Sequence, residues 1–103
     1  MYKYYTISMN YPFDYSREKS LILKETRGVD FEDVISAFEN RKLITEMSHP
    51  RQDKYPKQRI FIVEINKYVY VVPYVIDQKR KVRFLKTIYP NRKLTKKYLG
   101  KIK

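Results

Sequence analysis

The sequence predicts an α+β fold, in which a small antiparallel sheet follows two N-terminal helices and precedes a C-terminal helix. Residues 31–40 show helical periodicity of their apolar side chains, and residues 92–101 do so again. Residues 59–65 and 68–76 are rich in β-branched and aromatic side chains, and only two residues separate them, as in a hairpin. At 103 residues the chain has room for one domain, 1–103.

The N-terminal part is expected to hold a strand and a first helix. Residues 2–8 are rich in Tyr and favour a strand. Ser16 stands where a helix N-cap belongs and Gly28 where the residue after a helix belongs, which predicts a helix up to about Arg27. The apolar residues of this helix are consecutive rather than spaced by three or four, so they form a weak stripe: Leu21, Ile22 and Leu23.

The second helix has the clearest periodicity in the chain. Asp30 can cap a helix that begins at Phe31 and ends near Asn40. Its apolar side chains fall at positions i, i+3, i+4 and i+7, namely Phe31, Val34, Ile35 and Phe38. This spacing places them on one face, which we expect to pack against the sheet.

The remaining strands are expected to follow in order. Residues 43–47 favour a short strand, a polar loop follows, and the hairpin comes next with Asn66 and Lys67 as its turn. Pro73 lacks a backbone donor, which predicts a sheet edge or a bulge near the end of the second hairpin strand. Residues 82–89 are expected to form one further strand, and the helices are expected on one side of the sheet.

The final helix is expected to follow Asn91, which can cap it, and to run from Arg92 to about Lys101. Three apolar residues spaced by four are expected to face the sheet: Leu94, Tyr98 and Ile102. The N-terminus of this helix presents free backbone N–H groups and a partial positive charge, and both favour a bound anion.

Basic residues concentrate in the C-terminal part of the chain. The whole chain has 23 Lys and Arg against 11 Asp and Glu, a formal net charge of +12. Eleven of these cations, and no acid, lie between Gln78 and Lys103. A folded protein with so many charges of one sign usually meets a polyanion, most often nucleic acid, while a solvated basic tail is the alternative.

The sequence argues against several familiar kinds of site. With no Cys and one His, a thiolate or histidine metal cluster cannot form, and we expect no metal and no cofactor. Two glycines are too few for a Gly-rich phosphate loop. The longest apolar run, residues 68–76, is too short to span a membrane, and we expect a cytoplasmic protein with no membrane contact.

The composition permits RNA cleavage without a metal. Such cleavage needs a base for the 2′-hydroxyl, positive charge at the phosphorane and an acid for the leaving oxygen. Arg can hold phosphate oxygens, and Lys can move a proton when neighbouring cations lower its pKa. The candidates from the residues alone are Arg59, Lys86 and Arg92 for catalysis, and His49, Lys93, Lys96 and Lys97 for RNA contact. The alternatives are an ion pair for Arg59, a solvated face for the lysines of the final helix, and an incidental His49. For Lys86 the alternative is a side chain that extends from an apolar strand face to the solvent at its rim.

Three segments of the chain occur in an order that a known family shares. They are Phe13-Asp14-Tyr15-Ser16-Arg17-Glu18-Lys19, Arg27-Gly28-Val29-Asp30-Phe31-Glu32-Asp33 and Pro90-Asn91-Arg92-Lys93-Leu94-Thr95-Lys96-Lys97. In order and spacing they resemble the BrnT-type toxins of bacterial type II toxin–antitoxin systems, over roughly residues 13–99. That family has an aromatic-acid dipeptide before a Lys, then a His-Gly-Val-Ser-Phe-Glu-Glu stretch, and an Arg-rich segment after the last strand.

The resemblance implies a RelE/BrnT-like fold, related to the RelE-like ribonuclease toxins, and RNA cleavage without a metal. It also implies neutralisation by a small antitoxin that carries its own DNA-binding part. By position, Lys19 and Arg92 match the Lys and the C-terminal Arg of the family, and Tyr15 falls where the family has Trp. Arg59 and His49 match a central Arg and a loop His, and Arg83 lies near another Arg position of the family.

We therefore expect the ribonuclease toxin of a type II toxin–antitoxin system. Arg59 and Arg92 would stabilise the phosphorane, Lys19 or Lys86 would move a proton, and Tyr15 would position a base. The alternative is a non-catalytic protein whose basic surface binds nucleic acid or an acidic partner, and a homo-oligomer is compatible with either. The catalytic hypothesis requires Lys19, Arg59 and Arg92 to meet in one pocket.

Overall fold

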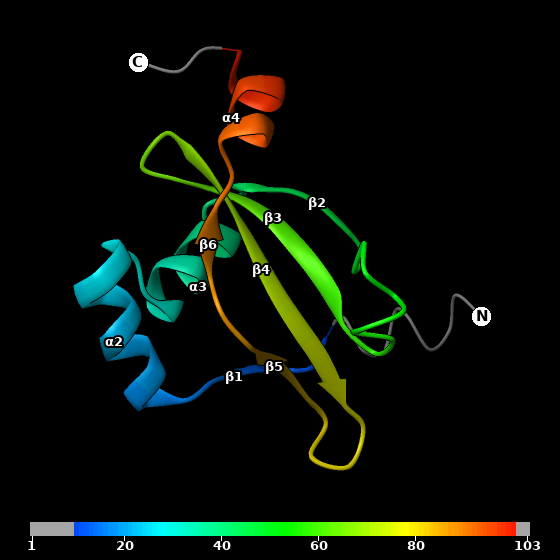
Figure 1. Cartoon of the computed structure of the whole chain (residues 1–103). Helices are drawn as coiled ribbons and strands as arrows, with labels where there is room; N and C mark the ends of the chain where they lie inside the picture. Colours follow the sequence, from blue (N-terminus) through cyan, green and yellow to red (C-terminus); the bar gives the residue numbers. More distant parts are fainter. Residues whose placement is uncertain (1–9, 101–103) are drawn as a thin grey trace.

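The computed structural model describes residues 10–100, and the strand expected at residues 2–8 lies outside them (Figure 1). The elements in chain order are β1 (Phe13–Asp14), α2 (Arg17–Arg27), α3 (Phe31–Glu39), β2 (Leu43–Ser48), β3 (Arg59–Ile65), β4 (Tyr68–Asp77), β5 (Val82–Leu85), β6 (Tyr89–Pro90) and α4 (Arg92–Leu99). Two helices precede most of the sheet and one follows it, so the predicted α+β class is confirmed.

The strands form one mixed sheet. Their order is β1-β5-β4-β3-β2, and β6 pairs with β4 beyond the end of β5. All neighbouring strands run antiparallel except β1, which runs parallel to β5. The prediction of a purely antiparallel sheet is therefore wrong at this edge. β1 has only two residues, Phe13 and Asp14, and so short a segment carries no alternating pattern that the sequence could reveal.

Different helices cover the two faces of the sheet. The face against α2 and α3, which we call the aromatic face, has buried residues that include Phe61, Val63, Val72 and Tyr74. The opposite face, which we call the aliphatic face, carries α4 on Ile60, Ile62, Val69 and Val71. The expectation that all helices lie on one side is thus wrong. Successive residues of β3 and β4 are apolar on both sides, so both faces must be covered.

The aromatic face is built around Phe61. Its ring stacks on the Tyr74 ring with 3.9 Å between centroids, and it meets Phe38 edge to face at 4.7 Å. Phe13 of β1 packs on Phe38 at 4.9 Å, which ties the first strand to α3. Phe61 and Tyr74 are buried in this core, and Phe13 and Phe38 are partly buried and pack against it.

The hairpin β3–β4 forms as predicted. Asn66 and Lys67 have positive φ values of 53° and 63°, the backbone that a two-residue turn with matching twist requires. The ladder then runs in register from Ile65 opposite Tyr68 to Arg59 opposite Tyr74.

Pro73 lies inside the sheet, where its missing donor is harmless. Its carbonyl accepts a 2.8 Å hydrogen bond from the Lys86 N–H, and within a strand the N and C=O of one residue point to the same side. That side faces the segment between β5 and β6, so the ladder with β3 continues in register past Pro73, which lies opposite Ile60. Neither an edge nor a bulge is involved, and the single strand predicted at residues 82–89 is divided instead into β5 and β6.

The helix caps lie where the sequence predicts them. The side chains of Ser16, Asp30 and Asn91 each accept a hydrogen bond from a backbone N–H of the first turn, and Gly28 ends α2 with φ of 77°. In α4 the inward residues are Leu94, Thr95 and Leu99, whereas Tyr98 is 37% exposed. Ile102, the third residue expected on the inward face, lies outside the described residues. None of the helices in residues 10–100 combines the length and the apolar composition that a membrane-spanning helix requires.

Candidate nucleic-acid interface

The outer side of α4 carries four exposed cations, which we call the basic ridge: Arg92, Lys93, Lys96 and Lys97. They fall at positions i, i+1, i+4 and i+5, so two successive turns each present a pair of cations. Within residues 10–100 none of the four forms an ion pair with an acid. The predicted exposure of the lysines is confirmed, and the ridge forms one continuous positive strip.

The ridge is held in place by polar contacts with the start of β4. The Thr95 side chain, 1% exposed, accepts a 2.9 Å hydrogen bond from the Val69 N–H and donates one of 2.8 Å to the Asn91 carbonyl. The Asn91 N–H donates to the Val69 carbonyl at 3.0 Å. Leu94 and Leu99 pack on the aliphatic face beside these bonds. α4 is therefore fixed on the sheet at its first two turns.

The cations at the start of α4 oppose the helix dipole, whereas Lys96 and Lys97 in its last turn suit it. The first turn of α3 carries Glu32 and Asp33, which favour the positive end of the helix dipole, and the first turn of α2 holds Glu18 between Arg17 and Lys19. The first turn of α4 contains no acid and instead begins with Arg92 and Lys93. Like charges also stand four residues apart along the ridge, an arrangement that costs about 0.2–0.5 kcal/mol per pair. A bound polyanion would relieve both unfavourable terms.

Tyr98 adds an aromatic surface beside the ridge. The Lys97 ammonium lies 5.3 Å from the centre of the Tyr98 ring, and the ring is more than one-third exposed. The spacing of four from Leu94 predicts an inward position for this ring, and the prediction is wrong. Thr95 fills that inward position instead, because its hydroxyl satisfies the Val69 N–H.

The three principal catalytic candidates do not share a pocket. Arg59 lies opposite Tyr74 on the aromatic face, whereas α4 is attached at Val69 on the aliphatic face. Five residues of β4 separate these two points, about 17 Å at ~3.4 Å per residue. Lys19, on α2, lines a hollow with Thr87 between β5 and β6, so β4 lies between it and β3. Figure 1 shows α2 and α4 at separate places on the molecule.

Arg59 belongs to a polar group at the end of the aromatic face. Its guanidinium forms two hydrogen bonds with the Glu46 carboxylate, one of them at 3.0 Å, and a third with the Ser48 hydroxyl at 3.2 Å. The Tyr74 hydroxyl donates to the same carboxylate at 2.6 Å. The bond from Glu46 raises the pKa of Arg59, and burial together with Glu46 raises the pKa of Tyr74. The ion pair that the sequence offered as the alternative for Arg59 is therefore present.

Arg83 lies near this group without an acid of its own. Its guanidinium carbon sits 4.0 Å from the centre of the Phe13 ring, and its Nε donates to the Tyr11 carbonyl at 2.9 Å. No ion pair between it and an acid occurs within residues 10–100. Burial lowers the pKa of Arg83, and the nearby Tyr74 phenol acts in the opposite direction. Arg83 pairs with Ile76 in the ladder, which places it on the aromatic face with Arg59.

Two other candidates are held by local contacts. The Tyr15 hydroxyl donates to Glu32, and its half-buried ring packs 5.1 Å from Phe31, so Tyr15 is held against α3. His49 is buried at the end of β2, where its Nδ1 accepts from the Arg51 N–H at 3.0 Å.

Lys86 is exposed, and its ammonium lies 5.6 Å from the centre of the Phe84 ring. The pairing of Phe84 with Val75 places that ring on the same side of the sheet as α4. Lys86 follows the end of β5, opposite Pro73, four residues along β4 from the site where α4 is attached. It is therefore separate from the basic ridge.

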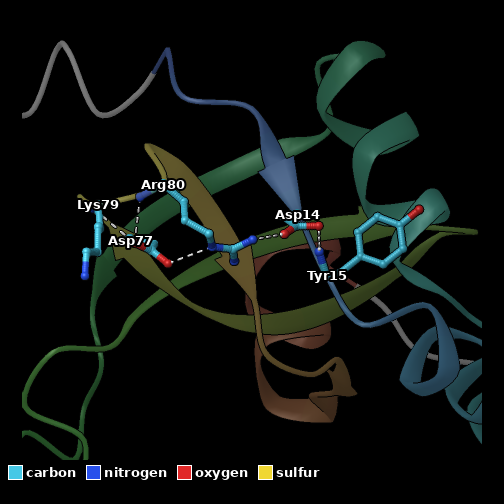
Figure 2. Close-up of polar contacts among 5 residues, drawn as sticks. All are labelled: Asp14, Tyr15, Asp77, Lys79 and Arg80. Atoms are coloured by element: carbon cyan, nitrogen blue, oxygen red, sulfur yellow. Dashed lines mark hydrogen bonds and ion pairs between the residues drawn. The ribbon is translucent and has the colours of Figure 1, made fainter.

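A second polar group neutralises Arg80. Its guanidinium lies between the carboxylates of Asp14 and Asp77, at 2.8 and 3.0 Å, and so connects β1 to the β4–β5 turn (Figure 2). The hydrogen bond from Arg80 lowers the pKa of Asp14, and the backbone N–H and side chain of Arg80 lower that of Asp77. Figure 2 shows the Tyr15 ring pointing away from these carboxylates. Arg80 therefore adds little net charge to the surface.

The acids in the described part of the chain form no metal site: residues 10–100 contain no group of three or more His, Asp or Glu side chains that could hold an ion. Comparisons with family models, with curated proteins and with solved structures found no match to this chain. The resemblance to the BrnT-type toxins thus rests on the sequence segments alone.

Proposed function

We propose that this protein binds single-stranded RNA through the basic ridge of α4. The observation that carries the proposal is the placement of Arg92 and Lys93 in the first turn of a helix, where the dipole disfavours cations. A residue choice that costs stability and is not compensated within the fold is expected at functional sites. Phosphate groups would compensate it, because they would meet both the cations and the free N–H groups of the helix end.

The combination of cations with an exposed ring favours a single strand over a duplex. Arg92 and Lys93 stand one turn from Lys96 and Lys97, about 6 Å along the helix axis. Tyr98 offers a ring beside Lys97, and stacking of a base on such a ring contributes about 1–3 kcal/mol. Phosphates on the cations and a base on the ring would then be held together.

The experiment that tests this function compares RNA affinity at several salt concentrations. The ridge variant carries Arg92→Gln, Lys93→Gln, Lys96→Gln and Lys97→Gln. Wild type should bind a fluorescent single-stranded RNA with a log–log salt slope that includes about 3 units from the ridge, at ~0.7 per phosphate contact. The ridge variant should lose these units and bind far more weakly at low salt. Since glutamine favours helices, the variant should fold.

A charge-matched control separates the ridge from net charge. It carries Lys54→Gln, Lys57→Gln, Lys67→Gln and Lys79→Gln, four exposed positions outside α4. Both variants have the same net charge, so a ridge-specific interface predicts near-normal RNA binding by the control. If RNA affinity falls equally in the two variants, RNA binding depends on the overall charge, and the basic ridge is not the binding site.

The second candidate is the metal-independent ribonuclease toxin that the resemblance implies. The observation that favours it is the group at the end of the aromatic face, where Glu46, Arg59 and Tyr74 are in contact and Arg83 lies near them. A carboxylate can serve as the base for a 2′-hydroxyl, and guanidinium groups can hold the phosphorane oxygens. The cytoplasmic location and the cognate antitoxin belong to this candidate.

This candidate is tested by incubating RNA with the purified protein in the presence of a metal chelator. A ribonuclease of this design should cleave RNA, and Glu46→Gln should lower the rate by about 10²–10⁴-fold. Growth inhibition on expression, abolished by Glu46→Gln, would accompany cleavage. Intact RNA after incubation with binding-competent wild type would leave RNA binding as the function.

A further inference from the structure

The outer side of α2 exposes apolar side chains that the fold does not use. Leu21 is 69% exposed and Ile22 is 51% exposed, and they are adjacent. Among residues 10–100 the only other exposed large hydrophobic side chains are Met47 and Tyr98, and both are less exposed, at 39% and 37%. Leu23, the third apolar residue of the run, is buried against the core. α2 therefore presents apolar side chains on two sides, and only one side is covered.

Beside Ile22 the surface is hollowed. A hollow of about 350 Å³ lies between α2 and the segment that joins β5 to β6. Ile22 and Leu23 supply its apolar lining, and Thr87 lies on its other side. A large aliphatic side chain of a partner would fit such a space against Ile22.

The charged residues around this hollow are Glu18, Lys19 and Arg27. Lys19 is exposed, and its ammonium makes no ion pair within residues 10–100. Arg27 donates to the Ile88 carbonyl and is not neutralised by an acid in that part of the chain. The rim thus carries two cations and one acid, on a chain whose net charge is +12. Both the rim and the chain as a whole favour an acidic partner.

We propose that the hollow beside α2 is a docking site for an acidic amphipathic segment of a partner protein. One apolar side chain of that segment would enter the hollow against Ile22, a second would cover Leu21, and its carboxylates would meet Lys19 and Arg27. The site lies apart from α4, so the inference stands independently of RNA binding. It assigns Lys19 to partner recognition in place of proton transfer.

Other occupants fit this surface less well. A second copy would bring together two chains of +12 each, which repel each other. RNA would meet the two cations, but its phosphates would gain nothing from Leu21 and Ile22. A membrane surface would receive only two exposed apolar side chains from an 11-residue helix, too little for stable attachment.

The test uses a synthetic probe: a helical peptide of about 15 residues with Leu on one face and Glu elsewhere. A control peptide has the same Glu residues but Ser at each Leu position. Binding is measured by fluorescence anisotropy at physiological salt. The Leu peptide should bind wild type at least about tenfold more tightly than the Ser peptide, because burial of the Leu side chains supplies the difference.

Two variants locate the binding site. Leu21→Gln with Ile22→Gln should weaken the Leu peptide by at least about tenfold, and both changes are at exposed positions in a helix that glutamine favours. Met47→Gln removes an exposed apolar side chain from β2 and should leave binding unchanged. Lys19→Gln should weaken binding and make it less sensitive to salt.

Four outcomes would overturn the proposal. Equal binding of the Leu and Ser peptides would show attraction to net charge alone. Undiminished binding by the Leu21→Gln, Ile22→Gln variant would place the peptide elsewhere. A dimer of the protein that this variant abolishes would identify a second copy as the occupant. Binding to vesicles of phosphatidylserine and phosphatidylcholine that this variant abolishes would identify a lipid surface.

Discussion

The two faces of the sheet are stabilised in different ways. The aromatic face is closed by two helices whose first turns carry acids and by rings stacked around Phe61. The aliphatic face is closed by one helix, which a buried hydroxyl and a few aliphatic side chains fix to β4. That helix has cations at both ends and no acid in its first turn. The difference indicates that the aromatic face contributes most of the free energy of unfolding. In α4 the unfavourable charges lower that free energy and provide a positive surface.

The largest loss of stability is expected from a substitution in the core of the aromatic face. Phe61→Ala removes a ring that is 3% exposed and contacts several others, so it should lower the free energy of unfolding by about 3–5 kcal/mol. Leu94→Ala on α4 should cost only about 1–2 kcal/mol, because Leu94 is half-buried. Urea unfolding of both variants measures the two values. Equal losses would remove the proposed difference between the faces.

The next effect concerns the polar attachment of α4. Thr95→Val keeps the shape but removes the acceptor of the buried Val69 N–H, and should lower the free energy of unfolding by about 1–3 kcal/mol. Thr26→Val is the matched control at an exposed helical position, expected within about 0.5 kcal/mol of wild type. If both variants unfold at the same urea concentration, the hydroxyl of Thr95 does not anchor the helix.

A smaller change in stability is expected when the charge at the start of a helix is reversed. Lys93→Glu should raise the free energy of unfolding by about 0.3–1 kcal/mol, since an acid suits the dipole of α4. The same variant should bind RNA more weakly. Glu18→Lys, the converse change in α2, should lower stability by about the same amount without loss of RNA affinity. Thermal unfolding and RNA titration of both variants measure these effects. A Lys93→Glu protein that is less stable than wild type would contradict the expected effect of the helix dipole.

The smallest effect is the acid response of the Asp14–Arg80 pair. The hydrogen bond from Arg80 lowers the pKa of Asp14 below its usual 3.8, so the pair stabilises the fold above that pH. This stability is lost as the pH falls through the lowered pKa. Because both side chains are exposed to solvent, Asp14→Asn should cost only about 0.2–1 kcal/mol at pH 7. The two proteins should converge in stability well below pH 3.8. A difference that persists in acid would assign the effect to something other than ionisation.

Local signals predicted the elements of the fold well. Ser16, Asp30 and Asn91 cap helices because their side chains reach backbone N–H groups close in sequence. The hairpin also depends on local chemistry at Asn66 and Lys67. What the sequence left hidden depends on distant pairing: the parallel contact of β1 with β5, the division of residues 82–90, and the position of α4 on its own face of the sheet. Apolar residues on both faces of β3 and β4 were the sequence signal that the second face, where α4 lies, must also be covered.

The candidate site was predictable only in part. The exposed cations of α4 follow from helical spacing, and the structure bears out their exposure. The separation of Lys19 from Arg59 and Arg92 could not be read from the chain, because it depends on which strands lie between them. Glu46 and Tyr74 were missed as partners of Arg59, although an acid within a partly apolar strand was a usable signal.

The most direct test of the central claim is a titration of isotope-labelled protein with single-stranded RNA, followed by the backbone amide signals. The claim predicts that the largest shifts occur in α4, at residues 92–98, together with the signal of Val69 beneath Thr95. Little change is expected in α2 or in β3. Shifts concentrated around Arg59 and Arg83, with α4 unaffected, would contradict the assignment of RNA binding to the basic ridge.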